Sequence, residues 1–279
     1  MGNNKDIKNV QEYISELPTL DKKLRKNFFY RGQSDEQYIL EPSIFRGKAK
    51  SKEEDVYLKV LSECSDEFDR NMTHIDILSK MQHYGVPTRL LDVTRNALVA
   101  LYFACDDDKN IKKNGCVFLF NPTENNIKQF DSDTISILSS LPRFKYDEKD
   151  ELKRIAIECT SNISKFNEKD IVQRLLHEIK KENPSFENII NPEDLLNNYF
   201  LIPKKDNPRI IRQSGAFIIH GLNDTEVTSY KKIIIPSSSK KTLLKQLQCF
   251  GISKATLHPE LYKMSEYIND CIRKKINFL

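Results

Sequence analysis

In the stretch MQHYGVPTRLLDVTRNALVALYFAC, residues 81–105, the composition changes more sharply from polar to apolar than elsewhere in the chain. Polar residues gather around a turn marked by Gly85 and Pro87, and the strongly apolar segment 96–105 follows directly. Glycine and proline end regular elements, and about ten apolar residues after a polar start fit a buried helix, with a strand as the alternative. A polar turn before a buried element is a common way for a rigid scaffold to present a site.

Short apolar segments on either side of this stretch predict the strands of a sheet. They lie at 28–32, 115–122, 199–203, 209–213, 216–221 and 232–236. Helical patterns predict helices at 6–17, 53–82, 238–249 and 259–274, and the polar middle, 123–198, is expected to be mostly helical and to form a peripheral lobe. We therefore expect an α+β fold in one domain, residues 1–279, with a sheet assembled from N-terminal and C-terminal strands.

The composition, 39% hydrophobic and 30% charged residues in 279, is typical of a globular protein. Basic and acidic residues are interleaved and the net charge is +4, so charge alone does not indicate a nucleic-acid-binding protein. A polar beginning and the absence of an apolar run of roughly 18 residues predict a cytoplasmic protein without a membrane segment. The six cysteines form no CxxC pair and stand at no zinc-like distance from a histidine, so reduced thiols and no metal site are expected.

Arg31 is the first candidate for a functional residue. It follows three aromatic residues at the end of a predicted strand and precedes Gly32 and Gln33. An unpaired guanidinium is costly to bury, so Arg31 must meet a carboxylate, a group of carbonyls or an anionic ligand. Its planar fork suits a pyrophosphate or a carboxylate, and Gly32 would let the backbone approach that ligand. The alternative is an internal salt bridge that fixes the strand.

The turn at 82–94 supplies further candidates. His83 is either a general acid or base or a structural hydrogen-bonding residue. Asp92 is either catalytic, paired with Arg89, or the cap of the helix that begins near Asn96. Gln213 is a candidate site residue if its side chain points into the same cleft as Arg31. No GxGxxG, Walker, HExxH or GxSxG motif is present, which disfavours Rossmann, ATP-driven and serine-hydrolase chemistry.

Several of these segments together resemble the FRG-domain family, which is named for a Phe/Tyr-Arg-Gly motif. The resemblance rests on YRGQ at 30–33, EPSIFR at 41–46, QHYGVPTRLLDVT at 82–94 followed by LVALYFA, RIIRQSGAF at 209–217 and GISKATLHPEL at 251–261. It extends over about 27–270. The chain departs from the family pattern at Val93, where tryptophan is usual, at His258, where an aromatic is commoner, and at Glu260, where aspartate is usual.

The aromatic-Arg-Gly strand also resembles, more loosely, the first motif of ADP-ribosyltransferases. That resemblance implies that Arg31 holds the phosphates of NAD and that Tyr84 or Tyr30 stacks on nicotinamide. The late glutamate of those enzymes has no clear counterpart here, because Gln213 lies in the right kind of strand without a charge. The expected NAD-binding residues are therefore Tyr30, Arg31, Gly32, Gln33, Tyr84, Thr88 and Arg89, and the expected catalytic residues are His83, Asp92 and Gln213.

These resemblances favour an NAD-consuming ADP-ribosyltransferase or NAD glycohydrolase-like effector, a toxin or anti-phage protein acting on a protein or nucleic-acid acceptor. This reading predicts that Arg31, His83, Tyr84, Arg89 and Asp92 converge on one cleft. One alternative is a non-catalytic module that binds a nucleotide or nucleic acid. The other is a protein-interaction domain, in which Thr88, Arg89 and Asp92 form one buried hydrogen-bond network.

Overall fold

The computed structural model describes residues 7–18, 27–69, 71–223, 227, 230–258 and 268. At its centre lies a seven-stranded sheet of order β4-β5-β6-β2-β1-β3-β7, in which every pair is antiparallel except β4 with β5. The strands are β1 (Phe29–Gln33), β2 (Leu90–Thr94), β3 (Gly115–Phe120), β4 (Ile127–Gln129), β5 (Tyr199–Ile202), β6 (Gly215–Ile219) and β7 (Tyr230–Ile235). The expected α+β fold, with a sheet built from distant segments, is confirmed.

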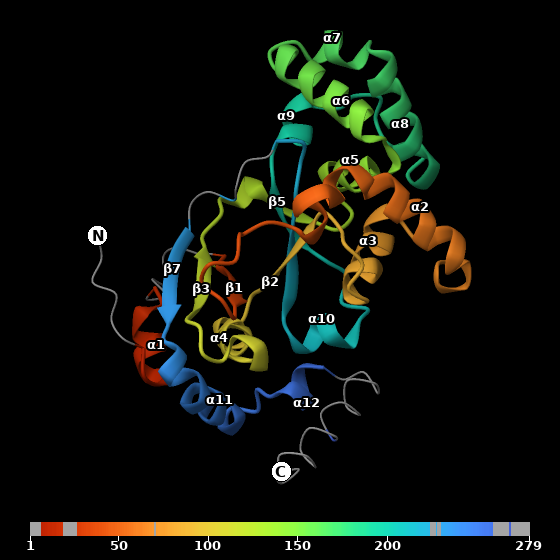
Figure 1. Cartoon of the computed structure of the whole chain (residues 1–279). Coiled ribbons are helices and arrows are strands. Elements are labelled where there is room, and N and C mark those ends of the chain that lie inside the picture. The colour runs from red at the N-terminus through yellow and green to blue at the C-terminus, as the bar shows by residue number, and fades with distance from the viewer. Residues whose placement is uncertain are drawn as a thin grey trace.

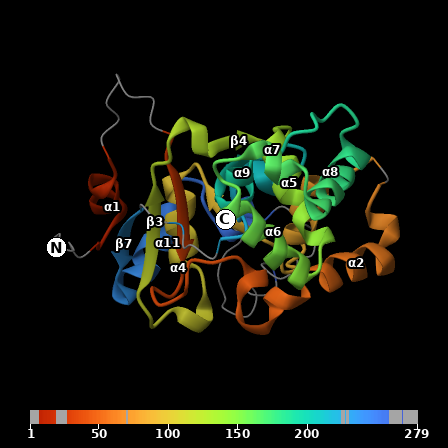
Figure 2. The same cartoon turned by 90° about the horizontal axis from the view of Figure 1, so that it is seen from above.

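Two groups of helices flank the sheet (Figure 1). The first group packs its apolar side chains against β1, β3 and β7 and comprises α1 (Val10–Glu16), α4 (Ala97–Cys105) and α11 (Lys240–Cys249). The second comprises α2 (Glu53–Glu63), α3 (His74–His83), α5 (Asp133–Ser140), α6 (Tyr146–Glu158), α7 (Ile163–Asn167), α8 (Asp170–Glu182) and α9 (Pro192–Leu196). Seen from above, the two groups lie at opposite ends of the molecule (Figure 2).

The long helix expected at 53–82 is wrong, because the chain forms two helices there. Helix α2 ends at Glu63, and α3 starts at His74 behind Thr73. The Thr73 hydroxyl accepts a hydrogen bond from the Asp76 N–H, while the Asp76 carboxylate accepts one from the Thr73 N–H. This reciprocal capping box satisfies backbone donors that a continuing helix would bond internally, so it starts a new helix.

The strand expected at 209–213 is also wrong. Residues Pro208–Arg212 form the short helix α10, and a further short helix, α12 (Lys254–Leu257), lies beside it in contact. The side chain of Asn207 caps α10 and Pro208 occupies its first turn, both of which favour a helix start over a strand. The helix expected at 259–274 falls outside the described residues apart from residue 268.

Helix α4 confirms the prediction that segment 96–105 is a helix. The Asn96 side chain accepts hydrogen bonds from the N–H groups of Leu98 and Val99 and so caps the helix. A Cβ atom added at Gly32 would lie 1.9 Å from the carbonyl oxygen of Ala100. The glycine after Arg31 therefore allows β1 to approach α4 closely. Within the described part of the chain, no helix is both long and apolar enough to cross a bilayer.

Candidate functional site

The candidate site is a cleft of about 350 Å³ at the centre of the sheet, which we call the Arg31 cleft. The ladder between β1 and β2 contains one register pair, Tyr30 opposite Thr94, so the two strands are not paired beyond it. Strand β1 pairs with β3 along its whole length, which fixes the position of Arg31. The cleft is lined by Tyr30, Arg31, Gly32, Gln33, Ser34, Tyr38, Arg46, Asp92, Val93, Thr94, Phe103, Arg209 and Gln213.

Arg31 and Gln33 line this cleft, and each has buried polar side-chain atoms without a partner among the described residues. Nη1 of Arg31 donates a 2.6 Å hydrogen bond to the main-chain oxygen of Asp92, but its buried Nε donates to no described residue. Burial lowers the pKa of Arg31, and the nearby charge of Asp92 acts in the opposite direction. Gln33 carries the larger cost of burial, because the residue is 5% exposed and neither its amide nitrogen nor its amide oxygen has a partner in the described part of the chain. Such atoms are expensive to bury alone, so they indicate a place for a ligand.

The cleft carries more positive than negative charge. Three of its described lining residues are arginines, and Asp92 is the one carboxylate among those residues. The hydrogen bonds described for these guanidinium groups run to main-chain oxygens: Arg31 to Asp92, Arg46 to Glu41 and Arg209 to His83. Carbonyl oxygens satisfy donors without cancelling their charge. The cleft is therefore suited to an anion with several oxygens, such as a phosphate or diphosphate.

The Asp92 carboxylate is exposed to the cleft and held from one side. Its Oδ2 accepts a 2.7 Å hydrogen bond from Nε2 of Gln82, and the oxygen of that amide accepts a 2.6 Å bond from the buried hydroxyl of Thr88. Thr88 thus orients Asp92 through Gln82. Neither alternative interpretation of Asp92 is realised, since Arg89 pairs elsewhere and Asn96 caps α4.

Arg89 lies outside the Arg31 cleft and is 1% exposed. Its Nε and Nη2 donate to the two carboxylate oxygens of Glu53 at 2.8 and 2.6 Å, and its Nη1 donates to the main-chain oxygen of His220. Lys149 donates to the same carboxylate at 2.8 Å. The expected buried network of Thr88, Arg89 and Asp92 is therefore divided: Thr88 and Asp92 meet through Gln82, and Arg89 belongs to an ion-pair cluster between helices.

His83 and Tyr84 line a different cleft, of about 470 Å³, which we call the second cleft. The convergence expected of Arg31, His83, Tyr84, Arg89 and Asp92 is thus met only by Arg31 and Asp92. Gln213, from the end of α10, does line the Arg31 cleft, and its Nε2 donates to the main-chain oxygen of Leu257. The second cleft is lined by Met72, Ile75, Asp76, Ser79, Lys80, His83, Tyr84, Phe130, Leu201, Pro203, Lys204, Asp206, Asn207, Pro208 and Phe217.

Tyr38 is a lining residue that no sequence motif indicated. The residue is 48% exposed, while its hydroxyl accepts a 2.8 Å hydrogen bond from Nδ2 of the buried Asn110. The main-chain oxygen of Asn110 in turn accepts a 2.9 Å bond from the ammonium of Lys240, a side chain with 0% exposure. This anchoring leaves an aromatic face at the cleft. Tyr30, the expected stacking residue, is 8% exposed.

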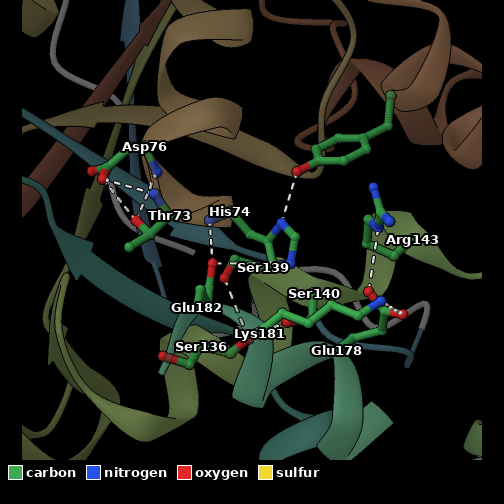
Figure 3. Close-up of polar contacts among 11 residues, drawn as sticks. Thr73, His74, Asp76, Ser136, Ser139, Ser140, Arg143, Glu178, Lys181 and Glu182 are labelled. Atoms are coloured by element: carbon green, nitrogen blue, oxygen red, sulfur yellow. Dashed lines mark hydrogen bonds and ion pairs between the residues drawn. The ribbon is translucent and has the colours of Figure 1, made fainter. Parts of the chain in front are cut away.

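A second polar cluster joins α3 to α8 (Figure 3), and Asp76 at its border also lines the second cleft. The main-chain N–H of His74 donates to the Glu182 carboxylate at 2.5 Å, and the hydroxyl of Tyr57 lies 2.8 Å from Nδ1 of the same histidine. Burial raises the pKa of Glu182 to about 7, although the hydrogen bond from His74 opposes the shift. Burial lowers the pKa of His74 to about 4, so the imidazole is neutral at pH 7.

This cluster predicts a specific pH dependence for Glu182→Gln. A carboxyl whose pKa rises from 4.5 to about 7 on folding contributes stability that is full below pH 4.5 and is lost as the pH rises through 7. Relative to wild type, the variant should therefore gain roughly 2 kcal/mol in free energy of unfolding between pH 5 and 8. Urea unfolding followed by circular dichroism at several pH values measures this difference. The exposed Glu187→Gln is the control, and a pH-independent offset for Glu182→Gln would contradict the prediction.

The fold and the cleft define a class: a mixed α/β domain with a cationic cleft between two central strands of a mostly antiparallel sheet. Residues 26–113 match the family model of the FRG domain, so the chain carries an FRG domain over this range. The matched range contains Arg31, Arg46 and Asp92, whereas Arg209 and Gln213 come from later in the chain. Comparison with curated proteins and with solved structures produced no match.

Proposed function

We propose that the Arg31 cleft binds the nicotinamide and diphosphate part of NAD and that the protein cleaves the bond between nicotinamide and ribose. The observation that carries this proposal is that the described lining of one cleft combines three arginines, the anchored ring of Tyr38 and a single carboxylate. Arginines bind phosphates, and an aromatic ring can stack on the flat nicotinamide ring. A carboxylate stabilises the positive charge that develops on the ribose.

Each group has a role that its position supports. The free Nε of Arg31 and the guanidinium groups of Arg46 and Arg209 hold the diphosphate oxygens. Tyr38 stacks on the nicotinamide ring, and its hydroxyl contact with Asn110 keeps the ring in place. The unpartnered amide of Gln33 can donate to and accept from the carboxamide of nicotinamide, whose donor and acceptor match it.

Asp92 is the group that favours the reaction. As the bond between C1′ and the pyridinium nitrogen breaks, its electron pair leaves with nicotinamide and positive charge develops on the ribose. A carboxylate stabilises that charge more in the transition state than in the bound substrate. A nucleophile then bonds to C1′ and releases its proton to solvent. The nucleophile is water in a glycohydrolase and an acceptor macromolecule in an ADP-ribosyltransferase, and an effector role such as a toxin or anti-phage protein follows from depletion of NAD or modification of the acceptor.

The test is release of nicotinamide from NAD by the purified protein, with and without cell lysate. We expect release by wild type and a loss of at least tenfold in Arg31→Ala, because a hydrogen bond to a charged group contributes about 1.5–3 kcal/mol. The control is Arg154→Ala, which removes an exposed arginine paired with Glu158 on the surface of α6. Dependence on lysate would identify a transferase. Binding of NAD without any release would identify a nucleotide-binding module instead.

A further inference from the structure

The two clefts share one wall. In α3, Gln82 contacts Asp92 of the Arg31 cleft, while the next residue, His83, lines the second cleft. In α10, Pro208 lines the second cleft, while the next residue, Arg209, lines the Arg31 cleft. The guanidinium of Arg209 donates to the main-chain oxygen of His83 at 3.4 Å and so crosses this wall. A cationic group therefore stands between two hollows.

The second cleft offers apolar and aromatic surface with little net charge. Phe130 and Phe217 line it together with Tyr84, a residue that is 61% exposed. Its two lysines are both paired: Lys204 with Asp76 at 2.9 Å, and Lys80 with Glu67 at 3.0 Å. Among the described residues that line this cleft, neither lysine is left without a counterion to bind a phosphate. A flat, neutral nucleobase suits the aromatic surface.

Asp206 also lines the second cleft and takes no part in the ion pairs of Lys204 and Lys80. It is exposed, and no hydrogen bond or ion pair joins it to another described residue. A carboxylate beside an aromatic nucleoside site is a good acceptor for the hydroxyls of ribose, as in dinucleotide-binding folds, and it repels a phosphate on the 2′ oxygen.

We propose that the second cleft receives the adenosine half of NAD, so that one dinucleotide spans both clefts and its diphosphate lies over Arg209. This inference rests on the proposed function, because the nicotinamide half occupies the Arg31 cleft. NAD consists of two nucleosides linked by a diphosphate, and the protein has two clefts with the guanidinium of Arg209 in the wall between them. The volumes, about 350 and 470 Å³, each fall within the range of sites for one small ligand. Asp206 then selects NAD over NADP.

Calorimetric titration with the two halves of the ligand tests this assignment. Tyr84→Ala should weaken the binding of NAD and of AMP by about tenfold, since stacking on a base contributes about 1–3 kcal/mol, and should leave nicotinamide mononucleotide unchanged. Asp206→Asn should weaken the binding of NAD several-fold and reduce the ratio of the affinity for NAD to the affinity for NADP. The matched controls are Phe250→Ala, an aromatic with the same 61% exposure outside both clefts, and Glu187→Gln.

The outcomes separate the two proposals. If NAD binds and Arg31→Ala weakens it, but Tyr84→Ala and Asp206→Asn behave like their controls, the adenosine assignment is overturned and the proposed function stands. An equal loss of AMP and nicotinamide mononucleotide in Tyr84→Ala would also overturn it, because the halves would share one cleft. If wild type binds no NAD, the proposed function fails and the adenosine assignment fails with it.

Discussion

Replacing Asp92 with asparagine should lower the rate of nicotinamide release by roughly 100- to 1000-fold, the usual effect of removing one preorganised electrostatic group. Asparagine has the same shape, and its amide oxygen can still accept the hydrogen bond that Gln82 donates to Asp92. The variant therefore removes the charge and little else. Single-turnover rates at saturating NAD report the bond-breaking step, and a separate binding titration reports affinity.

The affinity for NAD should change only a few-fold in this variant, because the charge acts on a cation that develops in the transition state. The matched control is Asp206→Asn, which removes the same charge from the second cleft. It should weaken binding and leave the rate at saturation close to that of wild type. Equal rates for wild type and Asp92→Asn would remove Asp92 from the chemistry and favour a role in positioning Arg31.

Most of the sheet was predictable from local patterns, because its strands are apolar runs bounded by glycine and proline. Two strands were not predicted. The β2 sequence LLDVT follows a polar turn and was interpreted with that turn, and the three-residue β4 lies in the segment 123–198 that was expected to be mostly helical. Helix α10 was misread because two isoleucines between arginines imitate a strand, although Asn207 and Pro208 marked a helix start.

The candidate site was predictable in part. Arg31, Asp92 and Gln213 do lie in one cleft, although they come from distant segments. His83 does not join them, because successive residues of a helix point about 100° apart, and Gln82 takes the direction of Asp92. Arg46 stood in the EPSIFR segment and could have been proposed from it. Tyr38 lies in a polar loop without any periodic pattern, so only the fold identifies it.

The role of Arg89 was out of reach of local patterns because its partners are distant in the chain. Glu53 lies 36 positions away and the His220 carbonyl 131 positions away. A basic residue beside a polar turn is equally compatible with a ligand and with an internal ion pair. The deciding fact is its burial at 1% exposure with three hydrogen bonds to Glu53 and His220.

That ion-pair cluster leads to the largest expected change in stability, for Glu53→Gln. The Glu53 carboxylate is 5% exposed, and it accepts hydrogen bonds from both Arg89 and Lys149. Burial alone would raise the pKa of Glu53, but the two cations outweigh it and lower the pKa to about 2. A neutral amide in its place would leave two buried cations without a counterion, which costs about 3–5 kcal/mol.

Arg89→Met is the informative comparison, because it should destabilise the protein less than Glu53→Gln. Removing the arginine leaves Lys149 and Glu53 as a neutral pair, whereas removing the carboxylate leaves two like charges together. The control is Glu63→Gln on the same helix, which breaks an exposed pair with Lys59 and should cost less than about 1 kcal/mol. Urea unfolding followed by circular dichroism is the suitable measurement, since the chain has no tryptophan. A loss in Arg89→Met that equals or exceeds the loss in Glu53→Gln would show that the hydrogen bond from Arg89 to His220 outweighs the charge balance of the cluster.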